Sequence, residues 1–170
     1  IPKQYKDTFE KGPLAIHESI GYSDFALQQF FKEAEKSAWF NNTLFVITAD
    51  HTFKATHKTY QNVNGIYAIP LVFYSPTDIL GNSIDKVCQQ ADVLPSIIDY
   101  LNIDTSFVSF GNSIWSDKCF AVNYLNNIYQ YFEEGHLLQF NGEESIALYA
   151  VEKDSLLKNN LLLQRPELHQ

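Results

Sequence analysis

The hydrophobic pattern of the first fifty residues predicts a helix followed by a buried strand. Apolar residues recur at helical spacing and share one face across roughly 14–38, although Gly21 could interrupt this helix. The run 43–49 (TLFVITA) is short, apolar and rich in β-branched residues. Continuous hydrophobicity of this kind is typical of a strand covered on both faces, as in a parallel sheet. The strand ends at Asp50 and His51.

The middle of the chain predicts a second buried strand and a second helix. The run 69–74 (IPLVFY) contains Pro70 near its start, where the missing N–H group is tolerated. The polar, irregular stretch 52–66 lies before this run, and long loops in compact domains are often functional. Asp92 is a good N-cap for a helix over 93–101.

After residue 111 the pattern changes to short aromatic or β-branched segments separated by turn residues. Such spacing predicts an antiparallel meander. The leucine-rich tail 156–170 favours a short helix. The order of helices and strands predicts an α/β sheet with an antiparallel extension. The segments of the meander are 119–124, 128–132, 136–140 and 145–151.

Composition narrows the classes of function. With 170 residues, 45% of them hydrophobic, the chain can form one packed domain. A net charge of -8 without a basic cluster argues against nucleic-acid binding. No apolar run is long enough to predict a membrane span. The two cysteines, Cys88 and Cys119, form no CxxC pair; two buried thiols are favoured, and a disulfide stays open. The absence of Met predicts a piece of a longer protein.

Asp50 and His51 are the candidate metal ligands. They follow a predicted buried strand, and ligands in open α/β sheets bind beyond the carboxyl ends of strands. A carboxylate and an imidazole together suit Zn²⁺ or Mn²⁺. The alternative is an aspartate that caps the following turn beside an ordinary histidine. Two residues do not complete a site, so further ligands must come from elsewhere.

An ordered series of segments resembles the sulfatase and phosphoglycerol-transferase branch of the alkaline phosphatase superfamily, in particular the lipoteichoic acid synthase group. The segment 45–52 (FVITADHT) is similar to the strand and "DH" motif of that branch. The other matching segments cover most of the chain in the family's order: YSDFALQQFF at 22–31, WFNNT at 39–43, IPLVFY at 69–74, QADVLPS at 90–96, and LY at 148–149 with Asp154 and 160–161.

The resemblance implies a fold and a role for the ligand pair. The expected fold is the C-terminal portion of an alkaline-phosphatase-like α/β/α sandwich with an antiparallel meander near the C-terminus. Residues 1–118 would belong to the α/β part of the catalytic domain, and 119–170 to its antiparallel extension and tail. Asp50 and His51 would bind a divalent metal such as Mn²⁺, Zn²⁺ or Ca²⁺.

The resemblance also implies what the chain lacks. The nucleophile (Thr, or a modified Cys or Ser) and a further acidic ligand would lie in an upstream N-terminal half, so no catalytic residue is assigned here. In the complete protein the metal would activate the nucleophile, which would form a covalent phospho- or sulfo-enzyme. The 170-residue chain alone is expected to be inactive. Thr48 and Thr52 flank the motif but do not stand in the nucleophile's context.

Substrate and location are further expectations. The substrate would be a phospholipid head group, such as phosphoglycerol or phosphoethanolamine, or a sulfate ester. The enzyme would be the extracytoplasmic domain of a membrane-anchored bacterial protein. His57 in the loop is a candidate substrate-binding residue, although a solvated loop histidine is the favoured interpretation. The competing hypothesis is a non-catalytic relative that binds a glycan or the cell envelope through aromatic residues of the meander, although packing of these residues against the sheet is the favoured interpretation. They are Tyr124, Tyr129, Tyr131 and Phe132.

Overall fold

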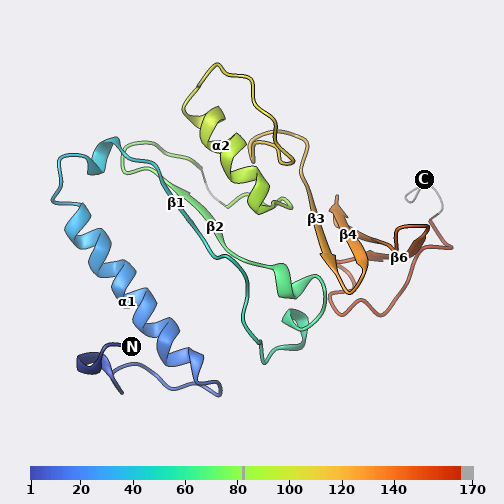
Figure 1. Ribbon diagram of the computed structural model, residues 1–170, viewed down its shortest axis with the longest axis horizontal. Coiled ribbons are helices and arrows are strands. Elements are labelled where there is room, and N and C mark those ends of the chain that lie inside the picture. Colours follow the sequence, from blue (N-terminus) through green and yellow to red (C-terminus); the bar gives the residue numbers. More distant parts are fainter. Residues whose placement is uncertain (82, 166–170) are drawn as a thin grey trace. The chain divides into compact units, whose positions relative to one another are not determined.

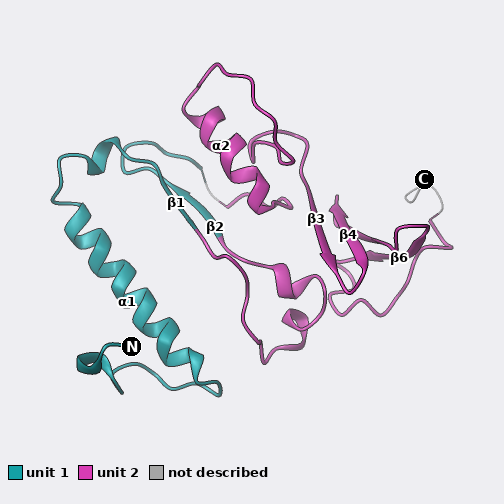
Figure 2. Cartoon of the chain, viewed as in Figure 1, with its two compact units in different colours: residues 1–47, 71–81 teal, residues 48–70, 82–170 magenta. Residues whose placement is uncertain are grey.

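The computed structural model describes residues 1–81 and 83–165, which fall into two compact units (Figure 2). The first unit comprises 1–47 and 71–81, and the second comprises 48–70 and 82–170. These units are not the two parts predicted from the sequence. The predicted boundary between 118 and 119, within one catalytic domain, stays a prediction. The helices and strands are α1 (Ile16–Ala34), β1 (Phe45–Thr48), β2 (Leu71–Tyr74), α2 (Val93–Tyr100), β3 (Phe120–Leu125), β4 (Ile128–Glu133), β5 (His136–Phe140) and β6 (Ser145–Ala150) (Figure 1).

In the first unit, α1 runs through Gly21 without interruption. A side chain at this position would meet Phe9 of the N-terminal segment, 3.1 Å from its Cβ, so the glycine permits close packing rather than a break. The core of this unit is an aromatic cluster around Phe45. The ring centroids of Phe31 and Tyr74 lie 5.0 and 5.9 Å from that of Phe45. The cluster therefore joins α1 to both strands.

Strands β1 and β2 pair with each other, and the contacts at their two ends show that they run antiparallel. Thr48 at the end of β1 donates its hydroxyl hydrogen bond to the carbonyl of Pro70, just before β2, at 2.9 Å. Phe45 at the start of β1 contacts Tyr74 at the end of β2. The expectation of a parallel arrangement is therefore wrong for this pair. A continuous apolar run indicates burial, but it carries no information about the direction of the neighbouring strand.

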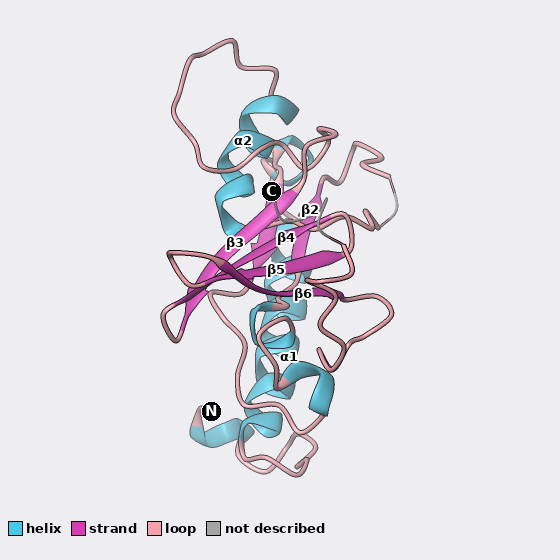
Figure 3. Ribbon diagram, turned by 90° about the vertical axis from the view of Figure 1, so that its right-hand side faces the viewer, coloured by secondary structure: helices cyan, strands magenta, loops and turns pink. Residues whose placement is uncertain are grey.

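The second unit contains the predicted meander, with strand order β3-β4-β5-β6 and antiparallel pairing throughout (Figure 3). Local turn chemistry accounts for its first two hairpins. Asn126 and Asn127 both have positive φ, as do Glu134 and Gly135. Two-residue turns with positive φ match the twist of hairpin strands, and Asn and Gly adopt this conformation most readily.

Both faces of the meander contain buried side chains, because Leu137 pairs with Phe132 and Tyr149 whereas Leu148 pairs with Leu138 on the opposite face. Leu137 on β5 and Leu148 on β6 are almost completely inaccessible, and Phe132 on β4 is buried as well. Gln130 is also buried, and its side-chain oxygen accepts a hydrogen bond from Gln139 across the β4–β5 pair at 2.9 Å. The buried amide is thus satisfied by a neighbour on the adjacent strand.

The tail does not form the predicted helix within its described part, 156–165. Instead, Asn160 binds β6: its side-chain oxygen accepts a hydrogen bond from the Leu148 N–H, and its amide donates to the Ile146 carbonyl. Leu157 has φ 52°, which is incompatible with a right-handed helix. The last five residues of this predicted helix, 166–170, lie outside the described residues.

Helix α2 confirms the predicted helix, but Asp92 does not act as its side-chain cap. The Asp92 carboxylate accepts hydrogen bonds from the backbone N–H groups of Gln89 and Asn112, both at 2.8 Å. With Gln89 it forms a capping box for the short 3-10 turn Gln90–Asp92, which leads into α2. Within the described residues, no helix has the combination of length and apolar character that crossing a bilayer requires.

Candidate metal site

Asp50 and His51 lie side by side in the turn that follows β1. The Asp50 Oδ2 and His51 Nε2 atoms are 3.4 Å apart, and both side chains are largely exposed, 86% and 74% respectively. The other carboxylate oxygen of Asp50 accepts a hydrogen bond from the His51 backbone N–H at 2.9 Å. The carboxylate therefore keeps Oδ2 free of backbone contacts while Oδ1 closes the turn.

The orientation of the His51 imidazole leaves its Nε2 atom available to bind a cation. His51 Nδ1 lies 2.8 Å from the carbonyl oxygen of Thr52. A carbonyl only accepts hydrogen bonds, so Nδ1 carries the proton and Nε2 has the lone pair in the neutral ring. Nε2 and Asp50 Oδ2 are then two neighbouring electron-pair donors. A proton or a metal cation shared between them would relieve their repulsion.

The hydroxyl groups of Thr48 and Thr52 are engaged with the backbone. Thr48 donates to Pro70, and Thr52 donates to the carbonyl of Ile66 on the far side of the loop. Both threonines thus tie the ends of the ligand turn to the chain that returns toward β2. Hydroxyl groups that donate to backbone carbonyls in this way agree with the expectation that neither threonine is the nucleophile.

The loop after the ligand pair contains two short 3-10 turns, Lys58–Tyr60 and Gly65–Tyr67. His57 is exposed at the start of the first turn, with its ring 6.2 Å from that of Tyr60. The structure does not bring His57 into contact with Asp50 or His51. Its predicted role in substrate binding stays a prediction.

A charge pattern of this loop is a signal that the sequence interpretation missed. From His51 to Thr77 there is no acidic residue, although the whole chain has a net charge of -8. Lys54 and Lys58 are both exposed in the same stretch. The segment after the ligand pair is therefore a locally basic part of an acidic chain, which favours an anionic ligand.

The donor set fits part of a metal site. A carboxylate oxygen and an imidazole nitrogen are suitable ligands for Zn²⁺ or Mn²⁺, and Ca²⁺ would use the carboxylate. Among the described residues, no group of three or more His, Cys, Asp and Glu side chains gathers to hold a metal ion. Asp50 and His51 can thus supply two ligands of a site.

The two cysteines are weak candidates for metal binding or catalysis. Cys88 and Cys119 are free and half-buried, in agreement with the favoured prediction of two thiols. Burial raises the pKa of the Cys88 thiol, and the nearby Asp92 carboxylate adds to this shift. A thiol with a raised pKa is a poor metal ligand and a poor nucleophile at neutral pH.

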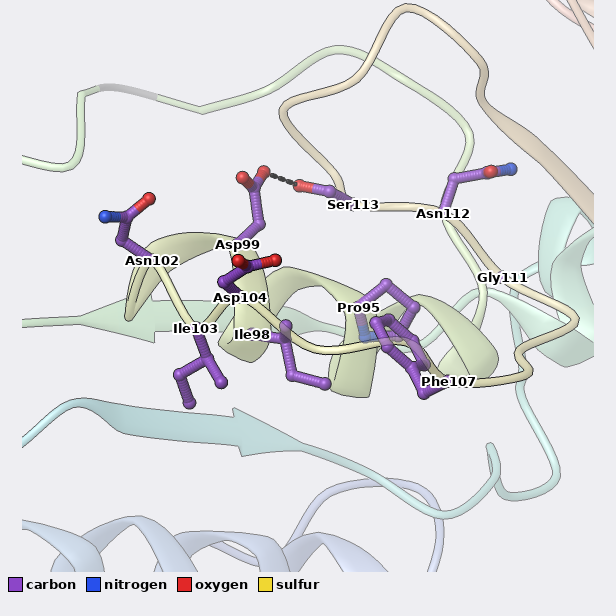
Figure 4. A pocket seen from close by; sticks show the side chains of 10 residues that line it. All are labelled: Pro95, Ile98, Asp99, Asn102, Ile103, Asp104, Phe107, Gly111, Asn112 and Ser113. Carbon is purple, nitrogen blue, oxygen red and sulfur yellow. Dashed lines mark hydrogen bonds between the residues drawn. The ribbon is translucent and has the colours of Figure 1, made fainter.

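A depression of about 580 Å³ lies beside α2, and it does not include the ligand pair (Figure 4). It is lined by α2 and by the segment that follows it, with Ile98, Ile103 and Phe107 as its apolar part. Its polar contact is a hydrogen bond from the Ser113 hydroxyl to the Asp99 carboxylate. Both groups are satisfied by each other, so the depression offers no cluster of reactive groups.

Comparison with known proteins decides the family. The family model described as Sulfatase matches residues 4–103, which is more than half of the chain and includes Asp50 and His51. The chain belongs to the sulfatase family. An arylsulfatase of Clostridium perfringens (strain 13 / Type A) is 21% identical over 178 residues, which cover 92% of this chain and 37% of that protein.

A solved structure supports the fold. The crystal structure of a protein in the alkaline phosphatase superfamily from Vibrio parahaemolyticus aligns with a TM-score of 0.69 and 18% identity, over 99% of this chain and 45% of that one. The predicted superfamily and the α/β fold class with its antiparallel meander are thereby confirmed. The chain spans less than half of the length of either protein.

Proposed function

We propose that this chain is the C-terminal part of the catalytic domain of a metal-dependent sulfatase-family enzyme that acts on phosphate or sulfate esters. Asp50 and His51 would be two of the metal ligands. The supporting observation is their geometry: two electron-pair donors 3.4 Å apart, exposed, with His51 Nε2 left free by the hydrogen bond at Nδ1. Membership of the sulfatase family gives this geometry its chemical context.

The residues of this chain would perform two tasks. Asp50 and His51 would hold the metal, which when bound supplies positive charge for the nucleophile and for the ester oxygens. The basic stretch with Lys54, His57 and Lys58 would attract the anionic ester through its local charge. The covalent step would use a Thr, Ser or Cys nucleophile upstream of this chain.

The remainder of the catalytic domain is the proposed partner. Several large apolar side chains of α1 and β2 are 40–55% exposed in this chain, which supports a cover by further protein. On this proposal the 170-residue chain alone is inactive. These side chains are Ile20, Leu27, Phe30 and Val72.

The transferred group is proposed to be a phosphodiester head group, phosphoglycerol or phosphoethanolamine, or a sulfate. The motif series of the lipoteichoic acid synthase group supports the phosphodiester, and the similarity to an arylsulfatase supports the sulfate ester. For the phosphodiester, the proposed location is outside the membrane, on a membrane-anchored bacterial protein, where such head groups are found.

The test is metal-dependent turnover by the full-length protein. Phosphodiester, phosphomonoester and aryl sulfate substrates are assayed with Mn²⁺, Zn²⁺ or Ca²⁺. Asp50→Asn should lower turnover by at least about a hundredfold, because it removes a charged ligand of the metal. Asp117→Asn, at an exposed aspartate elsewhere in the chain, is the matched control and should leave turnover unchanged. Equal turnover of the two variants would refute the assigned ligand.

The second candidate is a non-catalytic relative that binds glycans. The observation in its favour is an exposed row of aromatic rings on three adjacent strands, Tyr124, Tyr129 and Phe140, which are directly paired across the sheet. The Tyr124 and Tyr129 rings lie 4.7 Å apart. A full-length protein that binds no metal and turns over no ester, but loses glycan binding on Tyr129→Ala, would favour this candidate.

A further inference from the structure

The turn that carries Asp50 and His51 is held at its ends by the hydroxyl groups of Thr48 and Thr52, but the two candidate ligand side chains have few contacts of their own. Within residues 1–81 and 83–165, the Asp50 and His51 side chains are engaged with each other and with backbone groups of residues 51 and 52. Exposed side chains on a loop lose conformational freedom when they bind a metal, and this loss lowers affinity. A contact that fixes the turn beforehand would therefore matter for metal binding.

Gln90 provides such a contact from a distant part of the sequence. Its side-chain amide donates hydrogen bonds to the carbonyl oxygens of Ala49, at 2.9 Å, and Asp50, at 3.0 Å. One amide group thus spans two consecutive peptide units of the ligand turn. Both bonds lie within the second compact unit, and they join parts of the chain about forty residues apart.

The base of Gln90 is held firmly. Gln90 opens the 3-10 turn whose capping box joins Gln89 and Asp92. Asp92 is only 4% exposed, and its carboxylate accepts the N–H groups of Gln89 and Asn112. Ser96, fully buried on α2, donates to the Asp92 carbonyl at 2.6 Å. The amide of Gln90 therefore extends from a rigid, hydrogen-bonded base.

We propose that Gln90 is a positioning residue for the metal ligands. It acts through the Ala49 and Asp50 carbonyls, and it holds the backbone of the turn so that the Asp50 carboxylate and the His51 imidazole converge. This inference rests on the proposed function, in which these two side chains bind a divalent metal. Removing a hydrogen bond that supports the metal ligands from outside commonly lowers metal affinity by about 10–100-fold.

The test compares two variants in the full-length protein. Gln90→Leu keeps the bulk of the side chain and removes the donors, whereas Gln90→Glu is isosteric and its carboxylate cannot donate to a carbonyl. Titration with Mn²⁺ or Zn²⁺ by calorimetry should show affinity lower by about 10–100-fold for both. The melting temperature of the metal-free protein should change by less than about 2 °C, because Gln90 is exposed.

Gln61, in the loop that follows Asp50 and His51, offers a matched control for Gln90. Its amide also donates to two consecutive carbonyls, those of Ala55 and Thr56, at 2.9 and 3.3 Å. Gln61→Leu removes equivalent hydrogen bonds away from the ligand pair, and it should leave metal affinity unchanged. Equal loss of affinity for Gln61→Leu and Gln90→Leu would overturn the proposal, because a general loosening of the loop would then explain both.

The outcomes separate this inference from the proposed function. If Asp50→Asn abolishes metal binding and Gln90→Leu binds like the wild type, the positioning role fails and the metal site stands. If the wild type binds no metal, the proposed function fails. Hydrogen exchange at the amides of His51 and Thr52 then decides whether Gln90 holds the turn: about tenfold faster exchange in Gln90→Leu supports it, and unchanged exchange overturns it.

Discussion

The two sheets of this chain differ in how completely they bury their side chains. The meander β3–β6 buries Leu137 and Leu148 almost entirely, and the tail supplies Asn160 to its last strand. In the β1–β2 pair, Val72 remains 45% exposed and Tyr74 39% exposed. The meander is joined by short turns and completes its own core, whereas the two-stranded sheet carries the ligand turn and stays open. The well-buried strands thus belong to the meander, whereas the candidate metal ligands follow a strand of the open pair.

Among the substitutions that test this difference between the two sheets, Leu137→Ala should have the largest effect on the free energy of unfolding. Leu137→Ala leaves a cavity in the centre of the meander and should lower the free energy of unfolding by about 2–5 kcal/mol. Val72→Ala on β2 should lower it by less than about 1 kcal/mol, because the side chain is half-exposed. Urea unfolding of both variants measures the difference. Similar costs at the two positions would remove the contrast.

The attachment of the tail to the meander is tested at Asn160. Asn160→Ala leaves the Leu148 N–H and the Ile146 carbonyl without their side-chain partner and should lower the free energy of unfolding by about 1–3 kcal/mol. Asn159→Ala at the neighbouring exposed position serves as the control and should cost less than about 0.5 kcal/mol. Thermal unfolding followed by circular dichroism provides the measurement. No difference between the variants would argue against the tail as part of the meander's structure.

A smaller effect depends on pH at Asp154. Backbone N–H groups of Lys158 and Asn159 donate to its carboxylate and hold the pKa of Asp154 below its ordinary value of 3.8. A lowered pKa in the folded state means that the stabilisation is present above the ordinary pKa and is lost as the pH falls through the folded pKa. Asp154→Asn should therefore be less stable than the wild type near pH 6, and the gap should close as the pH falls below the ordinary pKa of 3.8 and through the lower folded pKa.

Unfolding curves of the wild type and Asp154→Asn, measured across this range, check the prediction. A gap that is independent of pH would show that the charge of Asp154 contributes nothing.

The smallest effect on stability is expected at the ligand turn. Asp50→Asn should change the free energy of unfolding of the metal-free chain by less than about 0.5 kcal/mol, because the side chain is 86% exposed. Calorimetric melting measures it. A loss of more than about 1 kcal/mol would give Asp50 a structural role and would weaken its assignment as a ligand kept free for metal.

Local chemistry explains which features could be predicted. The strands of the meander follow from aromatic and β-branched runs separated by turn residues, and Asn126, Asn127 and Gly135 in the turns have the positive φ that Asn and Gly adopt most readily. The helices α1 and α2 follow from apolar spacing over a few turns. The position of Asp50 and His51 at the end of β1 likewise follows from a short apolar run that ends in polar residues.

The tail shows where such reasoning stops. Its leucines favour a helix. In the structure, however, the Asn160 side chain forms hydrogen bonds with the backbone of β6, and the described part of the tail is not helical. The hydrogen bonds from Gln90 to the Ala49 and Asp50 carbonyls could not be predicted either. Contacts between residues about forty positions apart leave no periodic pattern in the sequence.

The sequence by itself determined the order of the elements, the meander with its turns, the candidate ligand pair and the family resemblance, because each depends on neighbouring residues. The tertiary structure alone decided the antiparallel direction of β1 and β2 and the link from Gln90 to the ligand turn. These depend on which backbone groups and side chains meet after folding, and that is set by packing across distant segments rather than by local preference.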